Sequence, residues 1–68
     1  MKLWIARDKD GMLYLYYEKP YKCRTMFLCD VDNGMRLDRN QFPEVTFENS
    51  PQEVELKLVK DNYGYKQG

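Results

Sequence analysis

Residues 3–17, LWIARDKDGMLYLYY, decide the fold of this chain. Two runs rich in aliphatic and aromatic residues, 3–7 and 12–17, flank a short loop that ends at Gly11. Such runs favour β-strands, and a glycine at the end of the loop between them is typical of a β-hairpin. The opening of the sequence therefore predicts two antiparallel strands joined by a tight turn.

The length of the loop decides which side chains share a face of this hairpin. In a three-residue loop, Lys9-Asp10-Gly11, the glycine takes the left-handed conformation and Asp8 pairs with Met12. This register separates an aliphatic face from an aromatic face, with the opposed pairs Leu3–Tyr17, Ile5–Leu15, Trp4–Tyr16 and Ala6–Tyr14. A two-residue Asp10-Gly11 turn would mix the two sets on both faces, so we predict the three-residue loop.

Further strand and turn signals follow along the chain. Strands are predicted at 23–29, 35–37, 44–48 and 53–58, from β-type residues or from period-2 alternation. The segment 30–34 ends in Asn33-Gly34, which can adopt positive φ, and it predicts a second hairpin turn. Residues 38–43 predict a single helical turn, with Phe42 folded back onto the core and Pro43 ending the turn.

Together these elements predict an all-β fold, a small antiparallel meander of five or six short strands that curls into a barrel or sandwich. At most one short helical turn is expected, near 38–43. We expect one domain over residues 1–60 and a flexible C-terminal tail over 61–68, because the tail has no period. The predicted core consists of the inward apolar side chains Leu3, Ile5, Leu13, Leu15, Phe27, Val45, Phe47, Leu56 and Leu58.

Charge and cysteine content narrow the class of protein. The formal net charge is zero, although residues 1–29 carry a net +3, residues 30–55 a net −5 and residues 56–68 a net +2. This distribution favours ion pairs between neighbouring strands. No apolar run of 18 residues is present, so we expect no membrane span and a cytoplasmic location. Cys23 and Cys29 are the only cysteines, and we expect both to be reduced.

The residue types needed for catalysis or for metal binding are scarce in the sequence. There is no histidine, so the hydroxyls of Ser50 and of the two threonines have no imidazole base to activate them. The same lack leaves no plausible ligand set for zinc. The paired carboxylates lie in the predicted turns 8–10 and 30–32, where aspartate bonds to the local backbone. We therefore expect neither an enzyme nor a cofactor or metal site.

Aromatic residues next to basic ones are the positive functional signal. Trp4, Tyr14 and Tyr16 share the predicted aromatic face, and Lys19 and Arg24 follow it along the chain. Tyrosine, tryptophan and arginine dominate the binding energy of protein interfaces. We therefore predict a non-catalytic module that binds a protein through Trp4, Tyr14 and Tyr16, with Lys19 and Arg24 at the rim. A related hypothesis is self-association through this face or through an open edge strand.

Two other interpretations of the aromatic face stay open. Aromatic and basic residues on a small β-sheet also bind single-stranded nucleic acid, although the acidic middle segment and the zero net charge disfavour that partner. Alternatively, the chain's own segment 38–48 covers Trp4, Tyr14 and Tyr16, which would then belong to the core.

Two parts of the sequence resemble a group of known proteins. Residues 3–11 with 13–15 and 18–20, and the later run 42–51, FPEVTFENSP, with 54–56, are similar to short uncharacterised proteins of gut-bacterial genomes and their phages. The resemblance covers most of residues 2–60. It implies a phage or mobile-element context, in which small proteins often act by binding and blocking host proteins, and it assigns no functional residue.

Overall fold

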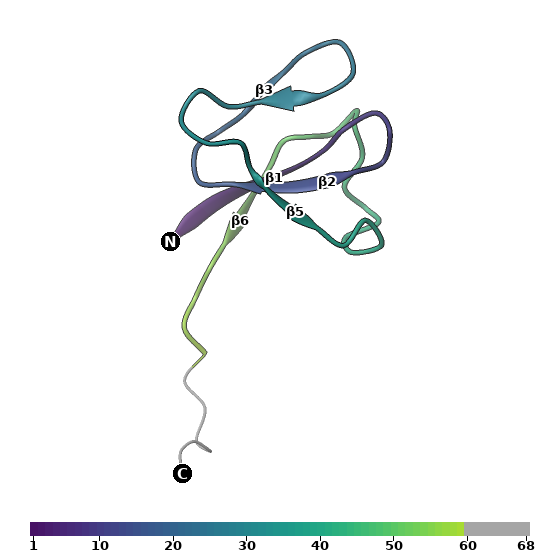
Figure 1. Ribbon diagram of the computed structural model, residues 1–68. Helices are drawn as coiled ribbons and strands as arrows, with labels where there is room; N and C mark the ends of the chain where they lie inside the picture. Colours follow the sequence, from purple (N-terminus) through teal and green to yellow (C-terminus); the bar gives the residue numbers. More distant parts are fainter. Residues whose placement is uncertain (60–68) are drawn as a thin grey trace.

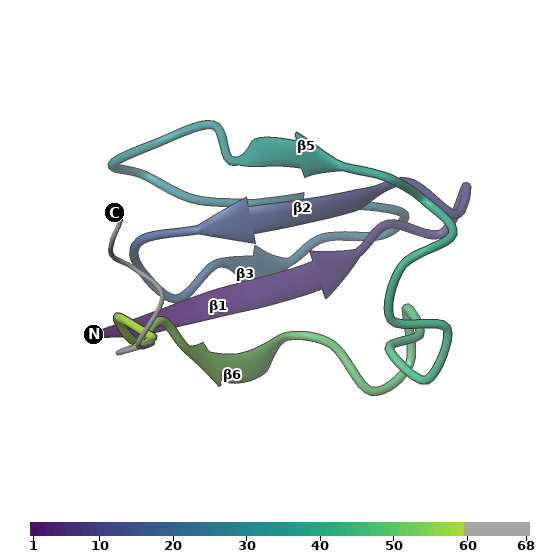
Figure 2. The same ribbon diagram turned by 90° about the horizontal axis from the view of Figure 1, so that it is seen from below.

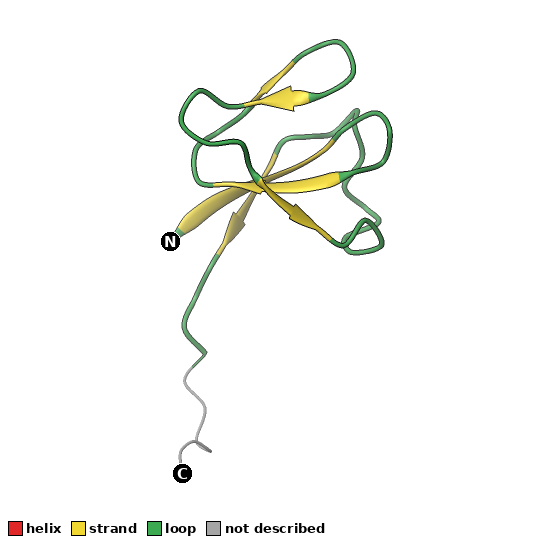
Figure 3. Cartoon of the chain, in the orientation of Figure 1, coloured by secondary structure: helices red, strands yellow, loops and turns green. Residues whose placement is uncertain are grey.

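The computed structural model describes residues 1–59, which form two antiparallel β-sheets and no helix (Figures 1 and 3). The larger sheet contains β1 (Lys2–Arg7), β2 (Leu13–Tyr16), β5 (Met35–Leu37) and β6 (Gln52–Glu55). The smaller sheet is the hairpin of β3 (Tyr21–Lys22) and β4 (Phe27–Leu28). The predicted small antiparallel all-β fold is confirmed, with six short strands over residues 1–59. None of these residues belongs to a helix that could cross a bilayer.

The strands of the larger sheet lie in the order β5-β2-β1-β6 (Figure 2). The chain leaves β2, forms the β3–β4 hairpin over one face, and returns to pair β5 with β2 through Leu13 and Leu37. It then crosses to the other edge, where β6 pairs with β1 through Leu3 and Val54. The turn at 30–34 has the predicted positive φ at Gly34, but it connects strands of different sheets rather than two neighbours.

The opening hairpin has the predicted three-residue loop and register. Trp4 lies opposite Tyr16, and Ile5 lies opposite Leu15. Asp8 N–H donates to the Met12 carbonyl at 2.8 Å, and Gly11 has a φ of 96°. Because that φ is costly for other residues, the glycine allows the turn that keeps the aliphatic and aromatic faces apart.

The aliphatic face of the larger sheet is covered by the irregular segment 38–50. Ile5 and Leu13 form the centre of this core with Val45, and Leu37 and Val54 pack against them. Val45 is therefore in the core, as predicted, although it does not belong to a strand.

Arg7 attaches segment 38–50 to the end of β1. Its guanidinium donates to five backbone carbonyls, those of Gly11, Arg39, Gln41, Phe42 and Val45, at 2.6–3.0 Å. Five is also the number of N–H donors that an arginine side chain has. The backbone N–H of Arg7 donates to the Ser50 hydroxyl at 3.0 Å, and that hydroxyl donates to the Thr46 carbonyl. The irregular segment thus receives from one residue the hydrogen bonds that a strand would receive from a neighbour.

The aromatic face is covered by the β3–β4 hairpin. Ala6, Tyr16 and Phe27 are buried together, and Phe47 reaches the same cluster from the other covering segment. The tip of the hairpin docks on the β1–β2 loop, where the Asp8 carboxylate accepts the Phe27 N–H at 2.9 Å. Lys9 N–H donates to the Thr25 carbonyl at 2.9 Å as well. The core is therefore divided by the sheet into an aliphatic and an aromatic half.

Two of the predicted strands are wrong. Residues 23–29 do not form one strand, because the chain turns at 23–26, where Cys23 N–H bonds to the Met26 carbonyl, before β4 begins. Residues 44–48 form turns instead of a strand. There Thr46 and Asn49 bond to each other's backbone N–H through their side chains, which replaces the ladder bonds of a strand.

The core prediction is wrong at its C-terminal end. β6 ends at Glu55, and Leu56 and Leu58 are 58% and 84% exposed. The last backbone pairing of this segment with the neighbouring strand is between Met1 and Leu56, which exchange hydrogen bonds. Phe42 is also exposed rather than folded onto the core, and residues 38–43 form turns without a helix. The predicted tail at 61–68 lies outside the described residues.

Alanine substitution should distinguish the buried Leu13 from the exposed Leu56. Leu13 is fully buried, so Leu13→Ala should lower the free energy of unfolding by about 2–5 kcal/mol. Leu56→Ala should change it by no more than about 0.5 kcal/mol, because this side chain is exposed in the single chain. Denaturant unfolding in dilute solution measures both values. Equal losses for the two variants would place Leu56 in the core.

Replacement of the Arg7 guanidinium should loosen segment 38–50. Arg7→Lys keeps the charge, but an ammonium has three donors and cannot reach five carbonyls, so we expect a loss of about 2–4 kcal/mol in unfolding free energy. Arg39→Lys is the matched control, because the Arg39 guanidinium donates to the Asp10 carbonyl at 3.3 Å on an exposed site. A loss for Arg7→Lys no larger than that of the control would contradict the role given to Arg7.

Candidate functional site

The structure separates the five predicted binding residues. Trp4 and Tyr14 are half-buried, Tyr16 is only 3% exposed, and Lys19 and Arg24 are exposed. All three aromatic side chains belong to the cluster under the β3–β4 hairpin. The open question about this face is thus answered: the hairpin covers it, and Phe47 of segment 38–48 contributes to the cover.

Tyr16 is a core residue with a satisfied hydroxyl. Its hydroxyl donates to the Phe27 carbonyl at 3.3 Å, in the buried space between the sheet and the hairpin. Burial, together with the nearby Asp8 carboxylate, raises the pKa of Tyr16 to about 12. Gly34 packs on the ring, since a Cβ at that position would lie 2.7 Å from a ring carbon. The Tyr16 side chain is therefore not available to a partner at the surface.

The two predicted rim cations lie at opposite ends of β1. Lys19 Nζ stands 5.4 Å from the centre of the Trp4 ring, near the start of the strand. Arg24 lies in the hairpin tip, next to Thr25, which bonds to Lys9 beyond the end of the strand. Trp4 and Lys19 form one small surface pair, and Arg24 is not part of it.

Lysines already occupy aromatic ring faces on this side of the molecule. Lys22 Nζ lies 4.4 Å from the Phe47 ring centre and 5.7 Å from that of Phe27. A nucleic-acid base would need such a ring face for stacking. The cation–π contacts therefore serve the packing of the hairpin, and they compete with a base at the same rings.

The aspartates of the turns bond to the backbone. Asp10 accepts the Met12 N–H at 2.9 Å, and Asp32 accepts the Gly34 N–H at 2.7 Å. Burial raises the pKa of Asp8, while its bond from the Phe27 N–H acts in the opposite direction. Within residues 1–59 no pocket is found, and no three histidine, cysteine or acidic side chains gather as metal ligands would.

The segment that continues β6 is exposed, although its residues Leu56 and Leu58 were predicted to lie in the core. Val54, Leu56 and Leu58 alternate with Glu53, Glu55 and Lys57. Beyond Val54, which packs on the aliphatic core, the apolar side of this alternation is exposed. Among the described residues, β6 has a neighbour on one side only, which is β1. The period-2 pattern could be recognised in the sequence, but the end of strand β6 at Glu55 could not.

No protein-family model matches the chain, and the comparisons with curated proteins and with solved structures likewise find no match.

The burial of Tyr16 should make the fold sensitive to alkaline pH. In the unfolded chain this phenol titrates near pH 10, so above that pH the unfolded state loses its proton first and is favoured. The stability that Tyr16 contributes is complete below pH 10 and is lost as the pH rises through about 12, by up to about 1.4 kcal/mol per pH unit.

Tyr16→Phe removes this titration and keeps the ring. Its difference from the native chain in unfolding free energy should therefore shrink between about pH 9 and about pH 12, as denaturant titrations at each pH would measure. Tyr17→Phe, at an exposed position, is the control. A constant difference for Tyr16→Phe over this range would show that the phenol is not buried as described.

Proposed function

We propose that this chain is a non-catalytic protein-interaction module and that it binds a partner strand along the outer edge of β6. The observation that carries the proposal is the exposure of Leu56 and Leu58, at 58% and 84%, on the apolar side of an alternating segment that continues β6. Alternation of this kind is typical of a strand with one covered face. A partner that continues the sheet would cover the two leucines.

The open backbone of β6 supports the same mode of binding. The N–H and carbonyl of Leu56 both bond to Met1, so they point toward β1. Because these groups alternate in direction along a strand, those of Glu55 point away from β1, toward the free edge. Addition of a strand there would provide main-chain hydrogen bonds for affinity and the apolar row for specificity.

The side-chain chemistry of the chain supports the non-catalytic part of the proposal. It has no histidine, and its serine hydroxyl is used between the Arg7 N–H and the Thr46 carbonyl. A cytoplasmic location suits Cys23 and Cys29, which are free thiols. In the phage or mobile-element context that the resemblance implies, a strand-binding module of this size would act by occupying an edge of a host protein.

Affinity capture from the native cells tests the site with three forms of the chain. The native chain, the variant Leu56→Asp/Leu58→Asp and the variant Trp4→Ala are compared by mass spectrometry, after circular dichroism has shown that each is folded. We expect the partner signal of Leu56→Asp/Leu58→Asp to be at least tenfold lower than that of the native chain, because this variant places charges on the apolar row. Trp4→Ala, which leaves the edge intact, should keep it.

Opposite results would assign the partner to the aromatic side. Partners that survive Leu56→Asp/Leu58→Asp but are lost in Trp4→Ala would overturn the edge proposal in favour of the Trp4–Lys19 pair. Partners that survive both changes would exclude both surfaces. Loss of capture only at raised salt, with nucleic acid in the eluate, would indicate a nucleic-acid ligand instead.

A further inference from the structure

We infer that the strand bound by this edge is the same segment of a second copy, β6 extended by residues 56–58, paired antiparallel about a two-fold axis at Leu56. The inference rests on the proposed function and names its partner. It also defines the register, so that Val54 of each copy lies opposite Leu58 of the other. Two larger sheets would then join into one continuous sheet with a shared apolar row.

The alternation along 53–58 restricts the possible registers. Residues directly opposite each other in an antiparallel pair lie on the same face. A two-fold axis that falls between two residues would oppose apolar with charged side chains at every position. The axis must therefore pass through a residue, which keeps the row of Val54, Leu56 and Leu58 on one face and Glu53, Glu55 and Lys57 on the other.

Charge selects one of the registers centred on residues 54 to 57. An axis at Glu55 would oppose two Glu55 side chains, and an axis at Lys57 would oppose two lysines. An axis at Val54 would oppose Glu53 and Glu55. An axis at Leu56 opposes Glu55 of each copy to Lys57 of the other, twice over. Opposite charges stabilise such cross-strand pairs and like charges destabilise them, so the register about Leu56 is the matched one.

The backbone geometry of the edge is compatible with this register. Glu55 directs its backbone groups away from β1, and Lys57 would do the same if a second copy extended the strand past Glu55, so the two residues could exchange hydrogen bonds with that copy. Leu56 lies at a non-hydrogen-bonded position, where opposed Cα atoms come within about 4.5 Å. The two Leu56 side chains would then be in contact at the axis.

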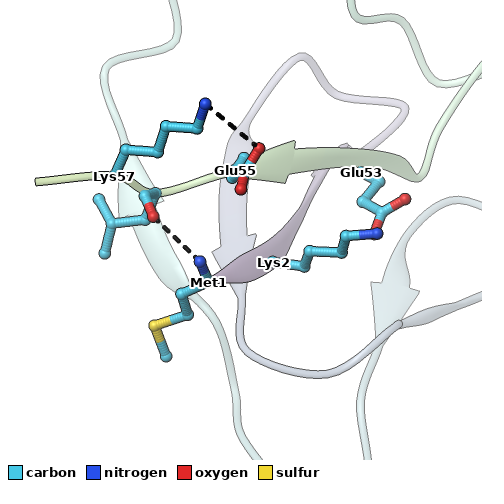
Figure 4. A network of polar contacts seen from close by, with 6 residues as sticks. Met1, Lys2, Glu53, Glu55 and Lys57 are labelled. Atoms are coloured by element: carbon cyan, nitrogen blue, oxygen red, sulfur yellow. Dashed lines mark hydrogen bonds and ion pairs between the residues drawn. The ribbon is translucent and has the colours of Figure 1, made fainter.

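In the single chain the side chains of Glu55 and Lys57 pair with each other (Figure 4). Glu53 is bound within the chain by Lys2, at 3.5 Å. Glu55 and Lys57 approach each other only to 4.0 Å, and their side chains are 53% and 73% exposed. An exposed pair at this distance contributes little to the single chain, so exchange for two pairs between copies costs little.

Charge reversal tests both the partner and the register. Sedimentation velocity over a range of concentrations should show the native chain passing from monomer to dimer. Glu55→Lys and Lys57→Glu should each raise the dimer dissociation constant about tenfold, because each opposes like charges twice. An equimolar mixture of the two variants, and the double variant Glu55→Lys/Lys57→Glu, should regain the native value. Glu44→Lys, an exposed reversal outside the edge, is the control.

The other results would overturn the inference in distinguishable ways. A native chain that stays monomeric at all concentrations excludes the second copy, and the proposed function survives if capture still depends on Leu56 and Leu58. If neither single reversal changes the dimer dissociation constant, or if the mixture does not restore it, the contact lies elsewhere or in another register. Circular dichroism of each variant excludes loss of the fold as the cause.

Discussion

The fold depends on the Arg7 guanidinium and on the carbonyls that it holds. A segment without regular structure has no strand ladder that attaches it to a sheet, so its carbonyls must bond to other donors. Segment 38–50 has no strand beside it, and Arg7 provides the donors at a single point. With that segment in place Val45 closes the aliphatic half of the core and Phe47 reaches the aromatic half. A chain of 68 residues thereby obtains two covered faces from one sheet.

Features that local chemistry determines could be predicted from the sequence. The opening hairpin depends on a glycine at the end of its loop and on the separation of aliphatic from aromatic residues, and both lie within residues 3–17. The strand Met35–Leu37 after Gly34 was found for the same reason. The turn at 23–26 contains neither glycine nor proline, so nothing local distinguishes it from a strand. It forms because Phe27 is placed over the aromatic face by its bond to Asp8, a contact between residues far apart in sequence.

In the candidate site, too, the features set by local sequence could be predicted, and those set by distant contacts could not. The sequence was sufficient to group Trp4, Tyr14 and Tyr16 on one face, because strand parity depends only on register. Whether that face is open depends on the β3–β4 hairpin, which no local signal predicts. At the other end, the alternation of 53–58 was correctly recognised, but it was assigned to the core. Its burial depends on whether the sheet continues past Glu55, where β6 ends.

The two edges of the larger sheet differ in what they can bind. Strand β5 is three residues long, and its middle residue, Arg36, lies opposite Tyr14 of β2. A second β5 laid antiparallel on it in full register would place two guanidinium groups face to face, and like charges in that position repel. Short, charged edges of this kind protect sheet proteins from open-ended stacking. In the proposed dimer the two β5 edges would remain at the ends of the joined sheet, and the repulsion between the Arg36 side chains would oppose further growth in full register.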